Sequence, residues 1–183
     1  MLEKYLINHC SPTLASLKTA NMFCCTFQSE ESFLNDVELW NQQMQEKGLY
    51  MTVLRKQEQR ALIYLCRPQR LEKDLNKKGV RKFLYACGYR GRDWKEMLEE
   101  LKENIKASEV FPHEIGVFLD YPLEDVIGFI KNTGKNCKCS GCWKAYGNEK
   151  EAEKKFFKYK KCKEVYSRLW ENGRSVLQLT VAA

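Results

Sequence analysis

The sequence lacks a long apolar run, and this absence bounds what the protein can be. No stretch approaches the ~18 consecutive apolar residues that a membrane-spanning helix requires. The first ten residues include Glu3, Lys4 and Asn8, so they lack the apolar core of a secretory signal peptide. We therefore expect a cytosolic (cytoplasmic) protein with no membrane partner.

Common catalytic signatures are absent as well. The sequence contains no phosphate-binding loop, dinucleotide-binding fingerprint, nucleophile elbow or paired-histidine zinc motif. Among 183 residues there are only two histidines, His9 and His113. The sequence also has no internal repeat, low-complexity tract or proline-rich linker, so we expect one globular domain over residues 1–183.

The charge balance is basic but mixed. A net charge of +7 would suit a nucleic-acid partner, and lysines crowd residues 154–163. However, Glu149, Glu151, Glu153 and Glu164 lie in and beside that stretch, and interleaved signs are typical of a solvated helix face. A nucleic-acid surface would gather basic and aromatic side chains on one face, so we do not expect such a partner.

Cysteine is abundant, and its number is odd. The nine cysteines cannot all pair internally, and a hydrophobic content of 44% can form a core without disulfides. Most of the thiols are therefore expected to be reduced. Cys66 and Cys87, set among leucine and tyrosine, are expected to pack as small apolar side chains.

Hydrophobic periodicity and capping residues predict helices interspersed with strands. In the first half of the chain, helices are expected over residues 2–9, starting again at Pro12, and from the cap Ser29 to Gly48. Further helices are expected over residues 68–75 and 79–87 and after the cap Asp93. The last two helices are expected to start at Pro122 and to run from Asn148 to about residue 172. Strands are expected over residues 21–27, 49–54, 60–65 and 114–119, with weaker signals within 137–146 and 175–182. The expected fold class is α/β or α+β, a small mixed sheet of about four or five strands covered by helices.

The first candidate site joins Cys10 with His113. Cys10 directly precedes Ser11-Pro12, an expected helix start, where unpaired amides and the helix dipole stabilise a thiolate. His113 precedes the expected central strand and could act as the base, an arrangement found in thiol hydrolases and transferases. His9 is an alternative base or a metal ligand. The structural alternative is that Cys10 packs in the core and His113 caps the strand.

Three further residues are candidates for binding a ligand. In open α/β sheets, ligands collect beyond the carboxyl ends of strands, where helix N-termini point at them. Tyr121 and Asp125 follow the expected central strand, and Lys18 follows the N-terminal segment. Asp125 would equally well be a helix-start charge that complements the helix dipole.

Another candidate site is a thiol-rich loop. Cys137, Cys139 and Cys142 lie within six residues, with Gly141 available to tighten a turn. Three sulfurs could surround one zinc or iron ion, although no fourth ligand is present locally. Redox pairing within the loop and incidental free thiols are the alternatives.

Several motifs span nearly the whole chain. They are His9-Cys10-x-Pro12-Thr13, His113-Glu114-Ile115-Gly116-x-Phe118-Leu119-x-Tyr121-Pro122 and Gly141-x-Trp143-Lys144-x-Tyr146. With these motifs the chain resembles an uncharacterised family of short bacterial proteins that carry a domain of unknown function and occur mainly in anaerobes. The resemblance implies a single-domain cytosolic protein, and it implies no activity, substrate or cofactor.

Three functional classes follow from the residues. The favoured one is a small-molecule-binding protein or thiol-dependent enzyme that uses Cys10 and His113. The second is a metal-binding or redox accessory protein that uses Cys137, Cys139 and Cys142. The third is a non-catalytic protein-interaction adaptor whose contact surface is the lysine-rich helix. The substrate and the oligomeric state are not predicted.

Overall fold

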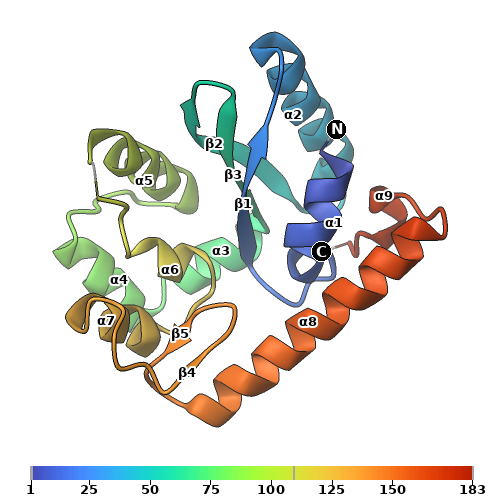
Figure 1. The fold of residues 1–183 in the computed structure, drawn as a ribbon. Helices are drawn as coiled ribbons and strands as arrows, with labels where there is room; N and C mark the ends of the chain where they lie inside the picture. The colour runs from blue at the N-terminus through green and yellow to red at the C-terminus, as the bar shows by residue number, and fades with distance from the viewer. Residues whose placement is uncertain (1, 109, 183) are drawn as a thin grey trace. The chain divides into compact units, whose positions relative to one another are not determined.

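The computed structural model describes residues 2–108 and 110–182, in which helices accompany a three-stranded and a two-stranded antiparallel sheet (Figure 1). The predicted fold class is confirmed in its α+β form. The chain forms two compact units: a terminal unit of Met1–Leu71 with Cys162–Ala183, and a central unit of Glu72–Lys161. Within the described residues, no helix is both long and apolar enough to cross a membrane.

The terminal unit is built on the three-stranded sheet, in the order β1-β3-β2. Its elements are α1 (Glu3–Leu14), β1 (Ala20–Thr26), α2 (Glu30–Gln45), β2 (Tyr50–Gln57), β3 (Arg60–Cys66), the start of α3 (Pro68–Leu75), the end of α8 (Glu149–Glu171) and α9 (Val176–Leu179). The predicted hairpin is confirmed as β2 and β3, whose register shifts between Val53 and Arg55. The predicted N-cap of α2 is confirmed, because the Ser29 side chain accepts a hydrogen bond from the amide of Ser32.

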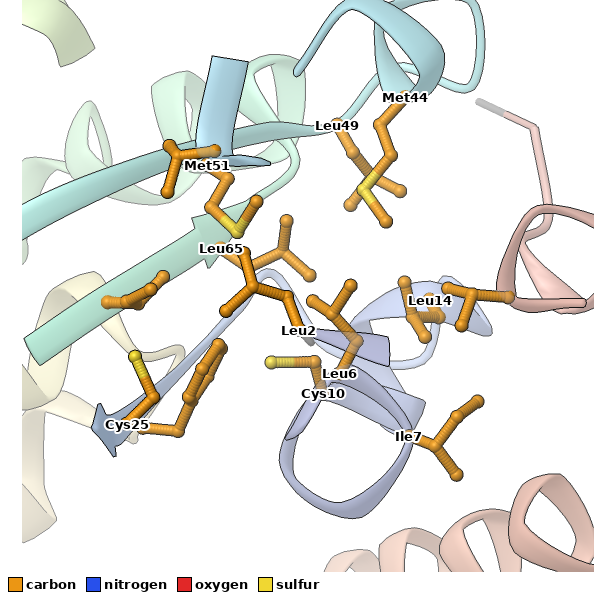
Figure 2. Packing of buried hydrophobic residues seen from close by; sticks show 14 of the residues in the cluster. Leu2, Leu6, Ile7, Cys10, Leu14, Cys25, Met44, Leu49, Met51 and Leu65 are labelled. Atoms are coloured by element: carbon orange, nitrogen blue, oxygen red, sulfur yellow. The ribbon is translucent and has the colours of Figure 1, made fainter. Parts of the chain in front are cut away.

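The core of the terminal unit lies on one face of the sheet and includes apolar side chains from α1 and α2. Leu2, Leu6 and Cys10 of α1 and Met44 of α2 belong to one cluster with Leu65 of β3 (Figure 2). β3 is the middle strand and is buried along all but its first residue. The true central strand is therefore β3, whereas the sequence suggested residues 114–119.

Helix α1 departs from the expectation at its C-terminal end. It continues unbroken through Pro12, where the sequence predicted a new helix start. A proline costs one backbone hydrogen bond inside a helix, but its fixed φ is compatible with helical geometry. The hydroxyl of Ser11, which was expected to cap a helix N-terminus, instead donates to the carbonyl of Ile7 inside α1.

Arg67 joins this helix end to the C-terminal segment of the terminal unit. Its side chain is buried, and its guanidinium donates to the carbonyls of Thr13 at 2.8 Å, Leu14 at 2.9 Å and Val181 at 2.7 Å. The carbonyls of Thr13 and Leu14 at the helix end each accept from one backbone amide as well, so Arg67 supplies a second hydrogen bond to each of them. Burial and the nearby charge of Arg70 lower the pKa of Arg67.

The central unit consists of helices and the small second sheet. Its elements are the end of α3, α4 (Lys78–Ala86), α5 (Trp94–Ala107), α6 (Ile115–Phe118), α7 (Leu123–Lys131), β4 (Cys139–Ser140), β5 (Lys144–Ala145) and the start of α8. The strand predicted over 114–119 is wrong, because this run forms the short, fully buried helix α6. A short apolar run has the same pattern whether it forms a buried strand or a buried helix, so hydrophobic periodicity could not distinguish the two structures. Gly116 permits close packing, since an added Cβ would lie 2.7 Å from Val126.

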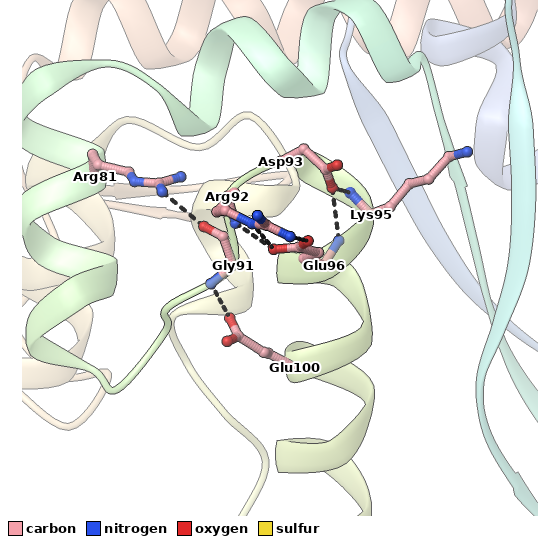
Figure 3. A network of polar contacts seen from close by, with 7 residues as sticks. All are labelled: Arg81, Gly91, Arg92, Asp93, Lys95, Glu96 and Glu100. Atoms are coloured by element: carbon pink, nitrogen blue, oxygen red, sulfur yellow. Dashed lines mark hydrogen bonds and ion pairs between the residues drawn. The ribbon is translucent and has the colours of Figure 1, made fainter.

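The loop between α4 and α5 is held by carboxylates from α5 (Figure 3). Asp93 caps α5 as predicted, because its side chain accepts from the amides of Lys95 and Glu96 at 2.9 Å. Glu100 accepts from the amide of Gly91 at 3.1 Å, and Arg81 donates to the carbonyl of that glycine at 2.7 Å. These contacts fix the loop from both sides.

The C-terminal segment is also helical. The weak strand predicted over 175–182 is wrong, because residues 176–179 form α9. Ser175 and Gln178 make a capping box, in which each side chain accepts from the other residue's amide, at 3.0 and 3.2 Å. A capping box in a sequence normally indicates a helix start. Here the β-branched residues that follow favour a strand, so the sequence pattern pointed away from the helix.

Candidate functional site

Cys10 is a core residue. It lies well inside α1 with no exposed surface, among the leucines of the terminal core (Figure 2). Burial raises the pKa of its thiol, and the charge of Lys18 offsets this only in part. The expected placement at a helix start is therefore wrong, and with it the reason for a stabilised thiolate. Lys18, a predicted ligand-binding residue, is itself buried in the same unit.

The two histidines lie in different units. His9 is exposed in the terminal unit, where its ring stacks on Tyr5 and Phe23 with centroids 6.2 and 5.9 Å away. Burial, and then the charge of Lys163, lower the pKa of His9. His113 is exposed in the central unit and meets the edge of Phe129 at 4.9 Å. The proximity of Cys10 and His113 stays a prediction.

The remaining candidates come together in the central unit. Residues 137–147, named here the thiol hairpin, contain β4 and β5 and all three thiols of the predicted loop. Cys139 pairs with Ala145, and the amide of Lys138 donates to the carbonyl of Ala145 at 2.8 Å. Cys137 and Cys139 are partly buried, whereas Cys142 is exposed in the turn.

Asp125 of α7 anchors the thiol hairpin. Its side chain is only 3% exposed. One carboxylate oxygen accepts from the indole N–H of Trp143 at 2.7 Å. The other accepts from the amides of Tyr146 at 2.7 Å and Gly147 at 2.8 Å. A buried carboxylate is stable only with such donors, so this predicted ligand-binding residue already has its partners inside the protein.

Tyr121 holds the turn of the same hairpin. Its ring stacks on Trp143 at 4.9 Å, and its hydroxyl donates to the carbonyl of Cys142 at 3.2 Å. Burial, and then the charge of Cys142, raise the pKa of Tyr121 to about 12. Trp143 in turn meets the edge of Phe156 of α8 at 4.5 Å. Tyr121, Trp143 and Phe156 therefore form a continuous series of ring contacts beside the turn that carries Cys142.

The glycines of these motifs allow close approach. A Cβ on Gly141 would collide with the ring of Phe156, and one on Gly128 would collide with Tyr146. Two lysines complete the framework, because Lys138 donates to the carbonyl of Gly147 at 2.6 Å and Lys144 to that of Gly134 at 2.7 Å. The hairpin is thus tied to its surroundings at both strands.

The electrostatic surroundings distinguish one thiol. Desolvation raises the pKa of Cys139, and the charges of Glu149, Glu153, Asp125 and Cys137 raise it further. Cys139 therefore keeps its proton at neutral pH. Cys137 is the thiol that lies close enough to influence the ionisation of Cys139.

The thiol hairpin has no complete metal site within the described residues. Across residues 2–108 and 110–182, no group of three His, Cys, Asp or Glu side chains could hold a metal ion. The sequence likewise offers no fourth local ligand.

Sequence reasoning found the thiols but missed what supports them. Trp143 was not predicted to contact Asp125, although the two lie only 18 positions apart. The available signal was the Gly-x-Trp-Lys-x-Tyr pattern, since a buried indole N–H requires an acceptor. Asp125, at the start of an expected apolar helix, was a carboxylate that could supply it.

One family model, described as "Protein of unknown function (DUF3793)", matches residues 6–180 and so covers nearly all of both units. This match confirms the expected resemblance to a family that carries a domain of unknown function. No curated protein and no solved structure matches the chain significantly.

Proposed function

The chain belongs to this family of proteins of unknown function, and we propose that it is a dithiol redox protein whose reacting residues are Cys137 and Cys139. The observation that carries the proposal is the placement of these two thiols two residues apart on an anchored hairpin. Cys137 lies just before β4 and Cys139 begins it. Both thiols are partly buried while Lys138 between them is exposed, which supports the two sulfurs lying on one side of the chain.

The spacing permits a bond between the two sulfurs. Alternate Cα atoms on an extended strand lie at most about 6.6 Å apart, which is near the upper end of the range that a disulfide spans. The chain bends at Lys138, and a bend can only shorten that distance. A disulfide near its geometric limit is more easily reduced, as reversible redox disulfides are.

The proposed reaction is exchange with a low-molecular-weight disulfide in the cytosol. The thiolate of Cys137 attacks one sulfur of the external disulfide, which forms a mixed disulfide and releases one thiolate. Cys139 then loses its proton to water and attacks the sulfur of Cys137, which expels the second thiolate. The protein dithiol is oxidised by two electrons, and the external disulfide is reduced to two thiols.

The raised pKa of Cys139 sets the pH dependence of the second step. Because Cys139 is protonated at neutral pH, ring closure is slow there and accelerates about tenfold for each pH unit below that pKa. The mixed disulfide on Cys137 should therefore accumulate at pH 7 and disappear faster at pH 9.

Mass spectrometry of the full chain tests the assignment. The reduced protein is equilibrated with oxidised glutathione, quenched in acid, alkylated with N-ethylmaleimide and cut at glutamate. The peptide that contains the thiol hairpin should carry one maleimide, on Cys142, and should lack two hydrogens. Cys142→Ser is the matched control and should still close the ring. Cys137→Ser and Cys139→Ser should both abolish ring closure.

Three outcomes would overturn the proposal. If Cys142→Ser abolished ring closure and Cys137→Ser did not, the reacting pair would be Cys139 and Cys142. If no internal disulfide formed at any glutathione ratio, the hairpin would have no redox role. If anaerobically purified protein retained stoichiometric zinc or iron that the triple serine variant lost, the thiols would be metal ligands.

A further inference from the structure

A hollow of about 520 Å³ lies at the end of the three-stranded sheet where β2 turns into β3, in the terminal unit. Its volume is within the range of small-molecule sites. The side chains that define its chemistry are Arg55 of β2, Arg60 and Leu62 of β3, and Cys24 of β1. None of these residues belongs to the thiol hairpin.

The strand register places these side chains on one face of the sheet. Leu62 is opposite Cys24 on one side and opposite Arg55 on the other. Arg60 lies two positions before Leu62 on the same strand, so it shares the face of Leu62. Diagonal neighbours across a strand pair lie about 7–8 Å apart, which brings the two guanidinium groups within reach of one ligand.

The two arginines are not neutralised within the part of the chain that the structure describes. Among the described residues, neither guanidinium has an ion pair or a side-chain hydrogen bond, and both arginines are exposed. Lys56, between them in sequence, alternates to the opposite face and pairs with Glu30. Glu58 also lines the hollow, and among the described residues its carboxylate makes no ion pair with either arginine. Two like charges therefore lie diagonally across the β2–β3 pair on one exposed face, where a single anion could contact both.

We propose that this hollow binds a small organic phosphate. Guanidinium groups bind phosphate oxygens through paired hydrogen bonds, and two of them match the double negative charge of a phosphate monoester. Leu62 and Cys24 supply a partly apolar floor for the organic part of the ligand. The hollow is a binding site separate from the proposed dithiol.

Cys24 provides a built-in reporter for this site because its thiol is exposed in the hollow. In a background where the other accessible thiols, Cys87, Cys137, Cys139 and Cys142, are serine, N-ethylmaleimide reacts with Cys24 alone. Phenyl phosphate should slow this reaction in a saturable manner, by about fivefold or more, and the protection should weaken with rising salt. Inorganic phosphate should protect at higher concentration, because it lacks the apolar part.

Arginine variants test the recognition directly. Arg55→Gln and Arg60→Gln should each raise the phenyl phosphate concentration needed for half-protection by on the order of tenfold. Lys56→Gln is the matched control, since it removes a positive charge from the same strand on the opposite face, and it should leave protection unchanged. Calorimetric titration of the wild-type chain with phenyl phosphate gives a second measurement that does not depend on Cys24.

The proposal is overturned if phenyl phosphate neither protects Cys24 nor releases heat at millimolar concentration. It is also overturned if benzyl alcohol protects as well as phenyl phosphate, or if Lys56→Gln weakens protection as much as the arginine variants do. Because the four hairpin and surface cysteines are serine in this background, none of these outcomes depends on the dithiol proposal.

Discussion

Each unit contains a buried charged side chain that binds several backbone groups, and the two charges have opposite signs. In the terminal unit, Arg67 donates to backbone carbonyls at the end of α1 and near the C-terminus. In the central unit, Asp125 accepts from backbone amides just before α8 and from the indole of Trp143. The cation therefore lies where backbone carbonyls converge, and the anion lies where backbone amides of the segment before α8 converge, so each charge matches the backbone groups around it.

The comparison also explains why the thiols of the two units differ. Cys10 packs in an apolar cluster, and burial raises the pKa of its thiol. The thiols of the hairpin lie on a surface element that polar bonds hold in place, so they remain reachable. A reactive thiol needs access and a fixed position, and the polar anchor supplies both to the thiols of the hairpin.

The largest effect is expected from Arg67→Met. This change removes three hydrogen bonds that a charged guanidinium donates, to the carbonyls of Thr13, Leu14 and Val181, so the free energy of unfolding should fall by about 3–5 kcal/mol. The carbonyls of Thr13 and Leu14 keep one backbone donor each, from the amides of Ser16 and Val181. Urea unfolding followed by circular dichroism measures the loss. Arg70→Met is the control, because Arg70 donates to the carbonyl of Ser16, and an equal loss there would contradict the role of Arg67.

Asp125→Asn should act on the central unit alone. The amide nitrogen of asparagine would face one of the three donors, so the free energy of unfolding should fall by about 1.5–3 kcal/mol. Hydrogen exchange at the amides of Tyr146 and Gly147 should accelerate, while exchange in β3 stays unchanged. Glu124→Gln on the exposed side of α7 is the matched control; if both variants exchange alike, Asp125 is not the anchor.

Gly141→Ala tests packing in place of charge. The added methyl group would meet the ring of Phe156, so the free energy of unfolding should fall by about 1–2 kcal/mol. The double variant Gly141→Ala with Phe156→Leu should recover part of that loss, because leucine leaves room for the methyl group. Additive losses in thermal unfolding would show that the two positions do not touch.

The smallest effect is a pH dependence from Cys10. Its folded-state pKa is raised, so its contribution to stability is complete below the unfolded pKa of about 8.5 and is lost as pH rises further. The free energy of unfolding should therefore fall by up to about 1.4 kcal/mol per pH unit above that value, and Cys10→Ala should remove this part of the slope. Urea titrations at pH 8 and 9.5 measure the difference; equal slopes in both proteins would contradict a buried neutral thiol.

Local signals in the sequence predicted much of the fold. The caps at Ser29 and Asp93 and the apolar periodicity of α5 are short-range features, and each was confirmed. The errors fell where local signals conflict with packing. Ser11-Pro12 reads as a helix start, yet a proline is tolerated in the last turn of a helix that is buried on its partners.

The candidate site was only half visible in the sequence. Three thiols within six residues are a pattern that sequence displays, so Cys137, Cys139 and Cys142 were identified. The anchor of Trp143 on Asp125 depends on how α7 meets the hairpin, which residue spacing does not encode. The register that gathers Arg55 with Arg60 depends likewise on the shift near Val53, which no composition signal marks.

The hydrogen bond from Arg67 to Val181 joins residues 114 positions apart. During synthesis on a ribosome, the entire central unit is made after Arg67 and before this acceptor. The central unit, whose anchor and hairpin are encoded within one continuous segment, could reach its native packing during that interval. The order of translation thus favours folding of the central unit before the two chain segments of the terminal unit form this hydrogen bond.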